Sequence, residues 1–271
     1  YNGLPDGKTL LEDAKDYSDV AIFCVTRSGA EDGELTYSQL QLTTREQEVL
    51  EMIRDNFGTV ILLINSSNVM ELSVVEEKSA NGNDIDAVLW IGHPGLSGNK
   101  AVAEILCGIT NPSGKLVDTW ARDLSSEQSF VNFGANTNYF NSGSNVGQAF
   151  QIYYEGIYVG YRYYETRYED YIYGRENVGT YDYASTVLYP FGYGLSYTQF
   201  TWSNYQVSEA DQDGNITIRL DVTNEGYRRG ADVVQVYVQS PYTAYDKQNG
   251  VEKPAVSLVG FAKTSVLDVG Q

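Results

Sequence analysis

The first 120 residues alternate between near-continuous apolar runs and segments that carry apolar residues at helical spacing. A strand buried on both faces of a parallel sheet loses the apolar–polar alternation, so we interpret each run as such a strand. The predicted strands are 19–25, 59–65, 87–92 and 115–120. The predicted helices are 8–18, 43–58, 69–77 and a segment through 101–106. This order predicts a mostly parallel α/β sheet.

From about residue 200 the pattern changes to short stretches in which apolar and polar residues alternate. The predicted strands there are 216–222, 232–238 and 256–261. Strands at this spacing predict an immunoglobulin-like β-sandwich. We therefore expect α/β plus all-β architecture, with an α/β domain over residues 1–200 and a β-sandwich over residues 201–271.

Residues 125–186 are rich in Asn, Ser, Gly and Tyr and lack clear apolar periodicity, which predicts a long loop region. The chain has 23 tyrosines, and a dense run of them spans residues 153–165. Aromatic faces suit sugar rings, but tyrosine more often packs one element on another. We interpret most of this run as packing and keep a sugar-facing wall as the alternative.

The formal net charge of −18 narrows the choice of partners. Nucleic acids and anionic membrane surfaces need a basic footprint, so neither is expected to bind. No stretch is apolar and long enough to span a bilayer. Cys24 and Cys107 are interpreted as buried thiols, and with the single His93 they make no credible zinc site. Localisation is left open between cytoplasm and secretion.

The loop from Arg27 to Leu35 holds the candidate chemistry. It follows the first predicted strand and carries three carboxylates, two glycines and one arginine. Open α/β sheets bind ligands beyond the carboxyl ends of their strands, and a carboxylate there acts as an acid or base if its pKa is tuned. The alternative is a solvated acidic turn.

A second glycine-rich loop surrounds His93. Its spacing does not fit the glycine patterns that bind dinucleotides or phosphates, and no nucleophile motif pairs with the histidine. We interpret His93 as a structural loop residue.

Several motifs together resemble glycoside hydrolase family 3, the β-glucosidase and β-xylosidase group. They occur in order along nearly the whole chain: Asn65 with Val69-Met70-Glu71-Leu72, Pro94-Gly95 with Gly98, Asn111-Pro112-Ser113-Gly114-Lys115-Leu116, Tyr154 to Tyr164, Phe191 to Tyr197, and Val222 to Gly226. The resemblance implies an α/β sandwich followed by a fibronectin type III-like module, as in versions from gut or rumen anaerobes, which makes a bacterial source the expectation.

The resemblance also implies a site. Family members are retaining glycosidases whose acid/base glutamate often lies on a Ser-Gly-Glu-Gly or Gly-Gly-Glu-Gly loop of the sandwich. Glu31 takes that place here, with Glu34 as the reserve candidate. Arg27 and Asp32 are candidate substrate-binding residues, and we expect Arg27 to anchor the loop through a charge-assisted bond to a neighbouring carboxylate. Ala30 and Asp32 depart from the glycines of the family pattern.

The sequence contains no barrel and no nucleophile motif of the family. We therefore expect a fragment that lacks the start of the sandwich and the end of the fibronectin-like module. Its expected partners are a β-glucoside or oligosaccharide and a TIM-like barrel of the same enzyme; a homo-oligomer is left open. No metal or organic cofactor is expected. The rival interpretations are a carbohydrate-binding module and a purely structural accessory module.

Overall fold

The computed structural model describes residues 8–29, 35–132, 138–139, 149–150, 153–175 and 178–271. The chain divides into two compact units, each assembled from separate stretches of sequence. The first unit consists of Tyr1–Ser97, Trp120–Val159 and Asp182–Leu188. The second consists of Gly98–Thr119, Gly160–Tyr181 and Tyr189–Gln271.

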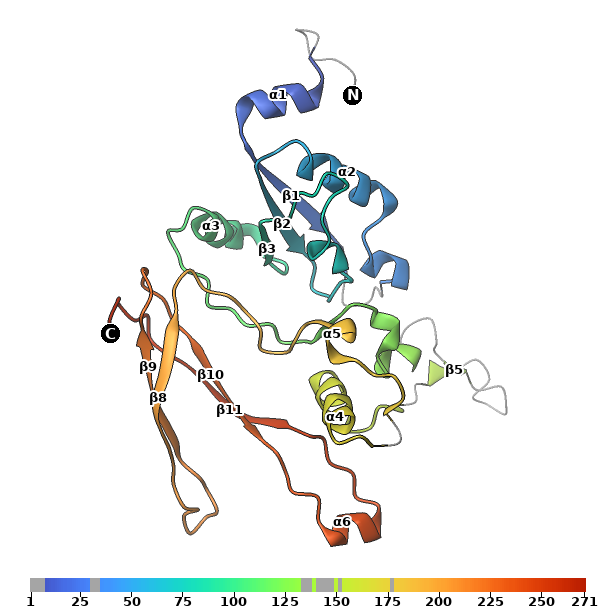
Figure 1. Ribbon diagram of the computed structural model, residues 1–271, viewed down its shortest axis with the longest axis vertical. Helices are drawn as coiled ribbons and strands as arrows, with labels where there is room; N and C mark the ends of the chain where they lie inside the picture. Colours follow the sequence, from blue (N-terminus) through green and yellow to red (C-terminus); the bar gives the residue numbers. More distant parts are fainter. Residues whose placement is uncertain (1–7, 30–34, 133–137, 140–148, 151–152, 176–177) are drawn as a thin grey trace. The chain divides into compact units, whose positions relative to one another are not determined.

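The first unit is built on a parallel sheet of order β1-β2-β3 (Figure 1). Its strands are β1 (Val20–Thr26), β2 (Thr59–Asn65) and β3 (Ala87–Trp90). The register pairs Val20 with Thr59 and Ile61 with Ala87. The predicted parallel α/β sheet is therefore confirmed for these three runs.

The prediction that both faces of a strand are buried is confirmed for β2 and wrong for β1. On one face of the central strand β2, Val60, Leu62 and Ile64 are each at most 1% exposed, and on the other face Leu63 is 8% exposed. On β1, Val20 is 47% and Ile22 53% exposed. The reason is position, because β1 is an edge strand of the described sheet and has one neighbour where β2 has two.

Two helices of this unit begin at threonine caps. In α1 (Leu10–Tyr17), Thr9 forms a capping box with Glu12; in α2 (Thr44–Arg54), Thr43 does so with Glu46. Helix α2 lies against β1 and β2 and buries Leu50 (Figure 1). The helix predicted over 69–77 is wrong, since only the 3₁₀ turn η2 (Ser73–Val75) forms there.

The fourth parallel strand, predicted over 115–120, is also wrong. Only Trp120 is extended in a strand, β4 (Trp120–Ala121), which pairs with β7 (Val187–Tyr189). Leu116 instead exchanges backbone hydrogen bonds with a distant turn: its N–H donates to Tyr193, and its carbonyl accepts from Gly192. The sequence of this segment does not show which part of the backbone it pairs with.

The remaining short elements of the first unit are η1 (Tyr37–Leu40), η3 (Leu124–Ser126), η4 (Ser129–Asn132), β5 (Asn138–Tyr139), β6 (Ala149–Phe150) and α5 (Tyr183–Thr186).

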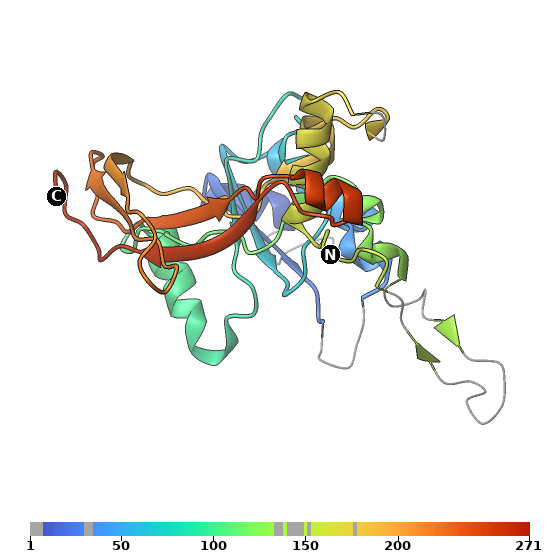
Figure 2. The same ribbon diagram turned by 90° about the horizontal axis from the view of Figure 1, so that it is seen from below.

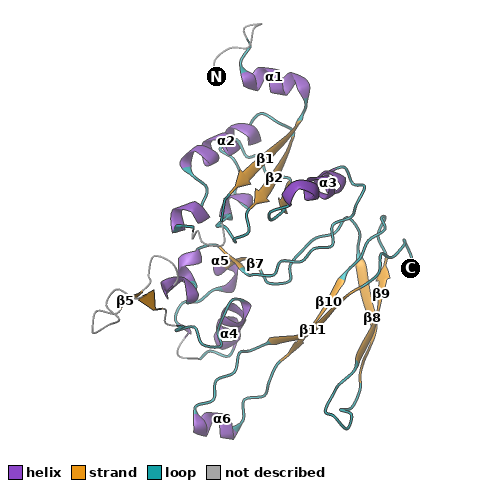
Figure 3. Ribbon diagram, turned by 180° about the vertical axis from the view of Figure 1, so that it is seen from behind, coloured by secondary structure: helices purple, strands orange, loops and turns teal. Residues whose placement is uncertain are grey.

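The second unit contains two antiparallel pairs, drawn as separate ribbons in Figure 3. One pair is β8 (Phe200–Val207) with β9 (Ile218–Asn224), and the other is β10 (Val233–Val238) with β11 (Ser257–Lys263). Helix α6 (Ala244–Asn249) lies in the connection between β10 and β11 (Figure 2). Most of α3 (Gly95–Leu106) also belongs to this unit.

The tyrosine-rich region contains a helix that the sequence did not predict, α4 (Tyr161–Ile172). Tyr164 is fully buried, at 0% exposed. Tyr161 packs its ring on Phe191 at 4.6 Å between centroids, and its hydroxyl accepts from the N–H of Leu258 at 2.9 Å. Tyr161 therefore attaches α4 to the turn before β8 and to β11 within one unit.

The Asn-Pro-Ser-Gly-Lys motif joins two other segments of the second unit. The side-chain oxygen of Asn111 accepts from the Ser196 hydroxyl and from the N–H of Tyr197, and its amide donates to the carbonyl of Arg229. Lys115 donates to the carbonyl of Gly194 at 2.8 Å. The motif thus tethers the Phe191–Tyr197 turn to the loop before β10.

Two further expectations concern the described residues. None of their helices has the length and apolar character that crossing a membrane requires. Both cysteines are exposed, so their predicted burial is wrong. Cys24 lies on the edge strand β1, whose outer face is uncovered in the described part of the chain.

Candidate active-site loop and its anchors

The three parallel strands end at the same edge of the sheet, and their following loops meet there. The N–H of Arg27, after β1, donates to the carbonyl of Asn65 at 3.0 Å. The N–H of Ile91, after β3, donates to the carbonyl of Ile64 at 2.9 Å. This edge is the ordinary ligand-binding position of an open α/β sheet. The candidate acidic loop leaves β1 at this edge.

Arg27 closes the base of that loop. It is only 8% exposed, and its guanidinium makes five hydrogen bonds. Two of them reach the carbonyls of Gln39 and Gln41, which lie on the far side of the loop in sequence. One side chain therefore staples the residues before the loop to those after it.

Glu46 supplies the charge that permits this burial. It forms a bidentate pair with Arg27, at 2.8 and 2.7 Å. Its carboxylate also accepts from the N–H and hydroxyl of Thr43, which caps α2. The Arg27 hydrogen bonds, followed by those from Thr43, hold the pKa of Glu46 below its ordinary value. Glu46 therefore stays ionised at neutral pH, and the pair joins the loop base to the start of α2.

The loops after β2 and β3 are tied to the same base. His93 donates its Nε2 hydrogen to the carbonyl of Arg27 at 3.1 Å. Trp90 donates its indole N–H to the carbonyl of the buried Ser66 at 2.6 Å. His93 thus completes the backbone hydrogen bonding of Arg27, beyond the last residues of the strand ladder.

Gly29 sits tightly against the loop after β2. A Cβ atom at this position would lie 2.7 Å from the side-chain oxygen of Asn68 and 3.3 Å from the hydroxyl oxygen of Ser67. The chain therefore leaves β1 through a gap that fits glycine without rearrangement. The sequence contains two glycines in this loop but does not show that Asn68 and Ser67 leave room only for glycine at position 29.

The downstream end of the loop is fixed by Tyr37 on η1. Its hydroxyl lies 2.8 Å from a carboxylate oxygen of Glu71 and 3.1 Å from one of Asp123. Burial, and after it the hydrogen bond to Glu71, raises the pKa of Tyr37 to about 12. Tyr37 therefore remains a neutral hydrogen-bond donor throughout the pH range of ordinary enzymes.

The predicted site residues have different outcomes. Glu31, Glu34 and Asp32 lie outside the described residues, so their roles stay predictions. The expected anchoring of Arg27 by a carboxylate is confirmed, whereas contact between Arg27 and a substrate stays a prediction. The sequence does not predict Glu46 as the partner of Arg27; its only signal for Glu46 is the Thr-x-x-Glu capping pattern.

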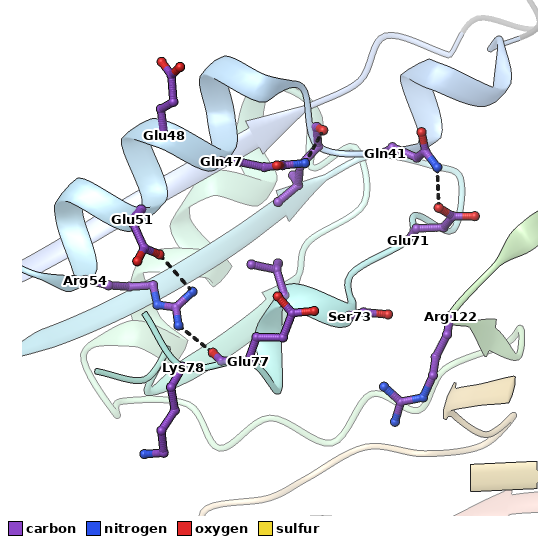
Figure 4. A pocket seen from close by; sticks show the side chains of 12 residues that line it. Gln41, Gln47, Glu48, Glu51, Arg54, Glu71, Ser73, Glu77, Lys78 and Arg122 are labelled. Carbon is purple, nitrogen blue, oxygen red and sulfur yellow. Dashed lines mark hydrogen bonds and ion pairs between the residues drawn. The ribbon is translucent and has the colours of Figure 1, made fainter. Parts of the chain in front are cut away.

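A polar pocket of about 660 Å³ lies beside the downstream anchor (Figure 4). Four glutamates, three cations and smaller residues line it: Gln41, Leu42, Gln47, Glu48, Glu51, Arg54, Glu71, Ser73, Val74, Glu77, Lys78 and Arg122. The cations are bonded within the unit; Arg54 donates to the carbonyls of Glu77 and Asn83, and Arg122 pairs with Glu76. The pocket thus lies between α2 and the segment after β2. Among the described residues, no cluster of His, Cys, Asp and Glu is arranged to hold a metal ion.

Comparison with known proteins assigns the family. The glycosyl hydrolase family 3 C-terminal domain matches residues 6–161. A β-glucosidase of Ruminococcus albus is 33% identical over 97% of this chain and 24% of its own length. β-Glucosidase A of Butyrivibrio fibrisolvens is 32% identical over 97% of the chain and 32% of its own length.

Solved structures agree with these matches. A β-glucosidase from Paenibacillus barengoltzii superposes with a TM-score of 0.77 at 33% identity, over 96% of this chain and 25% of that one. β-Glucosidase 3B from Thermotoga neapolitana, in complex with glycerol, gives a TM-score of 0.73 at 29% identity, over 100% of this chain and 33% of that one. The chain belongs to glycoside hydrolase family 3 and corresponds to its C-terminal region. It spans about a quarter to a third of the length of these relatives.

Proposed function

We propose that this chain supplies the general acid/base loop of a retaining, exo-acting β-glycosidase that removes terminal non-reducing β-D-glucosyl or xylosyl residues. Two facts support the proposal. The chain belongs to glycoside hydrolase family 3, and several of its relatives are named β-glucosidases. Its candidate loop also leaves the ligand-binding edge of the sheet from a base that is fixed on both sides.

In the proposed reaction Glu31 acts first as an acid and then as a base. A second carboxylate, on a TIM-like barrel outside these 271 residues, attacks the anomeric carbon while Glu31 protonates the departing oxygen. Water then attacks the glycosyl-enzyme ester, and Glu31 removes its proton. The two carboxyl groups of a retaining enzyme stand about 5–5.5 Å apart, so the loop must hold Glu31 to within a fraction of that distance.

The observation that carries the proposal is the staple made by Arg27. A solvated acidic turn has no use for a buried guanidinium with five hydrogen bonds. Arg27 and Glu46 fix the residues on both sides of the loop, and fixed ends suit a group that must transfer a proton at a fixed place.

The test is Glu31→Ala in the full-length enzyme. We expect hydrolysis of cellobiose, which has a poor leaving group, to fall by about 100-fold or more. An activated aryl β-glucoside needs no proton for its first step, so its slow step becomes release of the glycosyl-enzyme. Azide needs no general base and attacks that intermediate, which restores turnover and yields the β-glycosyl azide.

Glu34→Ala is the matched control in the same loop. We expect it to hydrolyse cellobiose within about threefold of the wild-type rate and to show no response to azide. If the azide response follows Glu34 in place of Glu31, the acid/base assignment moves to Glu34. If it follows neither residue, the acid/base role of this loop is wrong.

The proposal extends to the organisation of the chain. We propose that residues 1–200 are an α/β sandwich domain and that residues 201–271 are part of a fibronectin type III-like module. The antiparallel pairs β8–β9 and β10–β11 support the second assignment. We further propose that the 271-residue chain alone has no glycosidase activity, since the nucleophile lies elsewhere. Turnover of an aryl β-glucoside by the purified chain, abolished by Glu31→Ala, would contradict this statement.

A further inference from the structure

Glu71 is a carboxylate that the proposed reaction does not use, yet three donors converge on it. The Tyr37 hydroxyl and the backbone N–H of Leu124 bond to one oxygen, at 2.8 and 2.7 Å. The side-chain amide of Gln41 donates to the other oxygen at 2.6 Å, as Figure 4 shows. A carboxylate bound by several donors of fixed geometry is held rigidly.

Two of those donors lie in the segment that follows the candidate loop. Tyr37 begins η1, and Gln41 immediately follows it. The N–H of Glu71 also donates to the carbonyl of Leu40 at 2.9 Å. Glu71 therefore grips residues 37–41 at three points, from both its side chain and its backbone.

The same segment is the one that Arg27 staples. Arg27 bonds to the carbonyls of Gln39 and Gln41, so Arg27 and Glu71 hold the same segment, one from the end of β1 and the other from the segment after β2. Arg27 bonds to the backbone of this segment, and Glu71 adds bonds to its side chains at Tyr37 and Gln41.

We propose that Glu71 is a positioning residue of the reaction, acting through Tyr37 and Gln41 to set the downstream end of the acid/base loop. The inference rests on the proposed role of Glu31. Displacing a catalytic group by about 1 Å costs on the order of 100-fold in rate, so loosening one end of the loop reduces proton transfer without removing the acid.

The experiment compares variants of the full-length enzyme on two substrates. Cellobiose needs the acid in its first step, whereas 2,4-dinitrophenyl β-glucoside does not. We expect Glu71→Ala to lower kcat/KM for cellobiose by about 10-fold or more and for the dinitrophenyl glucoside by less than about threefold. Equal losses on both substrates, or no loss on either, would overturn the proposal.

Glu71→Gln provides the rescue. Its amide oxygen still accepts from Tyr37 and Leu124, and Gln41 can flip to present its own oxygen to the new NH₂ group. We expect this variant to retain kcat/KM within about threefold on both substrates. Loss as large as that of Glu71→Ala would show that the negative charge itself is required, which contradicts a positioning role.

Two further variants complete the design. Glu77→Ala is the matched control, because Glu77 lines the same pocket and its carboxylate makes no bond to residues 37–41 among the described contacts. We expect it to behave as wild type. If Glu71→Ala fails to fold, Tyr37→Phe is tested in its place. A larger loss of kcat/KM for cellobiose than for the dinitrophenyl glucoside, which we call the leaving-group split, supports the proposal. Equal losses, or no loss, overturn it.

Glu31→Ala in the same assay separates the two hypotheses. If Glu31→Ala shows the leaving-group split and Glu71→Ala does not, the positioning role alone is wrong. If Glu31→Ala shows no split, the acid/base role of the loop fails first, and the inference about Glu71 falls with it.

Discussion

The guanidinium of Arg27 and the carboxylate of Glu46 meet in a bidentate ion pair, at 2.8 and 2.7 Å, between the end of β1 and the start of α2. Their side chains are 9% and 22% exposed. In water such a pair is worth little, but here each partner makes further bonds that a single replacement leaves unsatisfied.

We expect Arg27→Ala to lower the free energy of unfolding by about 3 kcal/mol, because it removes the cation from a half-buried carboxylate and a donor from three backbone carbonyls. Denaturant unfolding followed by Trp fluorescence measures this, since Trp90 and Trp120 lie in the same unit. The control is Arg45→Ala on α2, whose pair with Glu48 is 81% and 59% exposed. Its cost should stay under about 0.5 kcal/mol, and equal losses would contradict the staple.

The same pair makes stability depend on pH in the acid range. Because bonds to Arg27 and Thr43 hold the pKa of Glu46 below its unfolded value of about 4.3, its contribution is complete above that value. It is lost as the pH falls through the lower pKa of the folded state.

We therefore expect the stability difference between wild type and Glu46→Gln to be constant from about pH 8 to pH 5 and to shrink below about pH 4. Urea unfolding at a series of pH values measures the difference. Subtracting one protein from the other removes the effects of carboxylates common to both, including Asp246, whose pKa is lowered to about 2. A difference that grows on acidification would contradict the assignment.

The sequence predicted the parallel core because three apolar runs alternate with helical segments, an order typical of parallel α/β sheets. It failed at residues 115–120, where the backbone of Leu116 pairs with Gly192 and Tyr193, more than 70 positions away. It also failed at α4, because tyrosine favours strands and the aromatic run masks the helical period. The buried stripe there depends on Phe191 and β11, which no local pattern reveals.

Part of the candidate site could likewise be predicted from the sequence, and part could not. The loop and the need for an anchor at Arg27 followed from residue types and spacing. The partners did not, because Glu46, His93 and Glu71 lie 19 to 66 positions from Arg27 and reach it or its loop only through the fold. The carboxylate of Glu46 belongs to the capping box with Thr43, whose Thr-x-x-Glu pattern is visible in the sequence. It also pairs with Arg27, and no local pattern shows that contact.

Asn224 performs a comparable anchoring function in the second unit. It is 0% exposed, and its amide group makes four hydrogen bonds to a hydroxyl, one backbone N–H and two carbonyls. Its partners are Thr198, Gly226, Arg228 and Leu267. We expect Asn224→Ala to cost about 3 kcal/mol in denaturant unfolding, since it leaves several buried polar groups unpaired.

Asn224→Asp keeps the acceptor oxygen but turns a second acceptor toward the two carbonyls, so we expect it to be at least as destabilising as the alanine variant. Asn249→Ala is the control, because Asn249 is exposed and bonds only to the carbonyl of Tyr245 in the described contacts. It should cost less than about 0.5 kcal/mol. A tolerated aspartate would show that Asn224 does not act as a donor.

The tight contact between Gly29 and Asn68 can be used to test how the chain leaves β1 and enters the loop. A methyl group at Gly29 would lie 2.7 Å from the side-chain oxygen of Asn68, so Gly29→Ala must displace either Asn68 or the loop. We expect the single variant to lower kcat/KM for cellobiose in the full-length enzyme by about 10-fold. Asn68→Ala removes the obstructing oxygen, and Gly29→Ala combined with Asn68→Ala should recover most of that loss. The coupling energy from the double-mutant cycle measures the steric conflict, and a value of zero would show that the loop leaves β1 independently of Asn68.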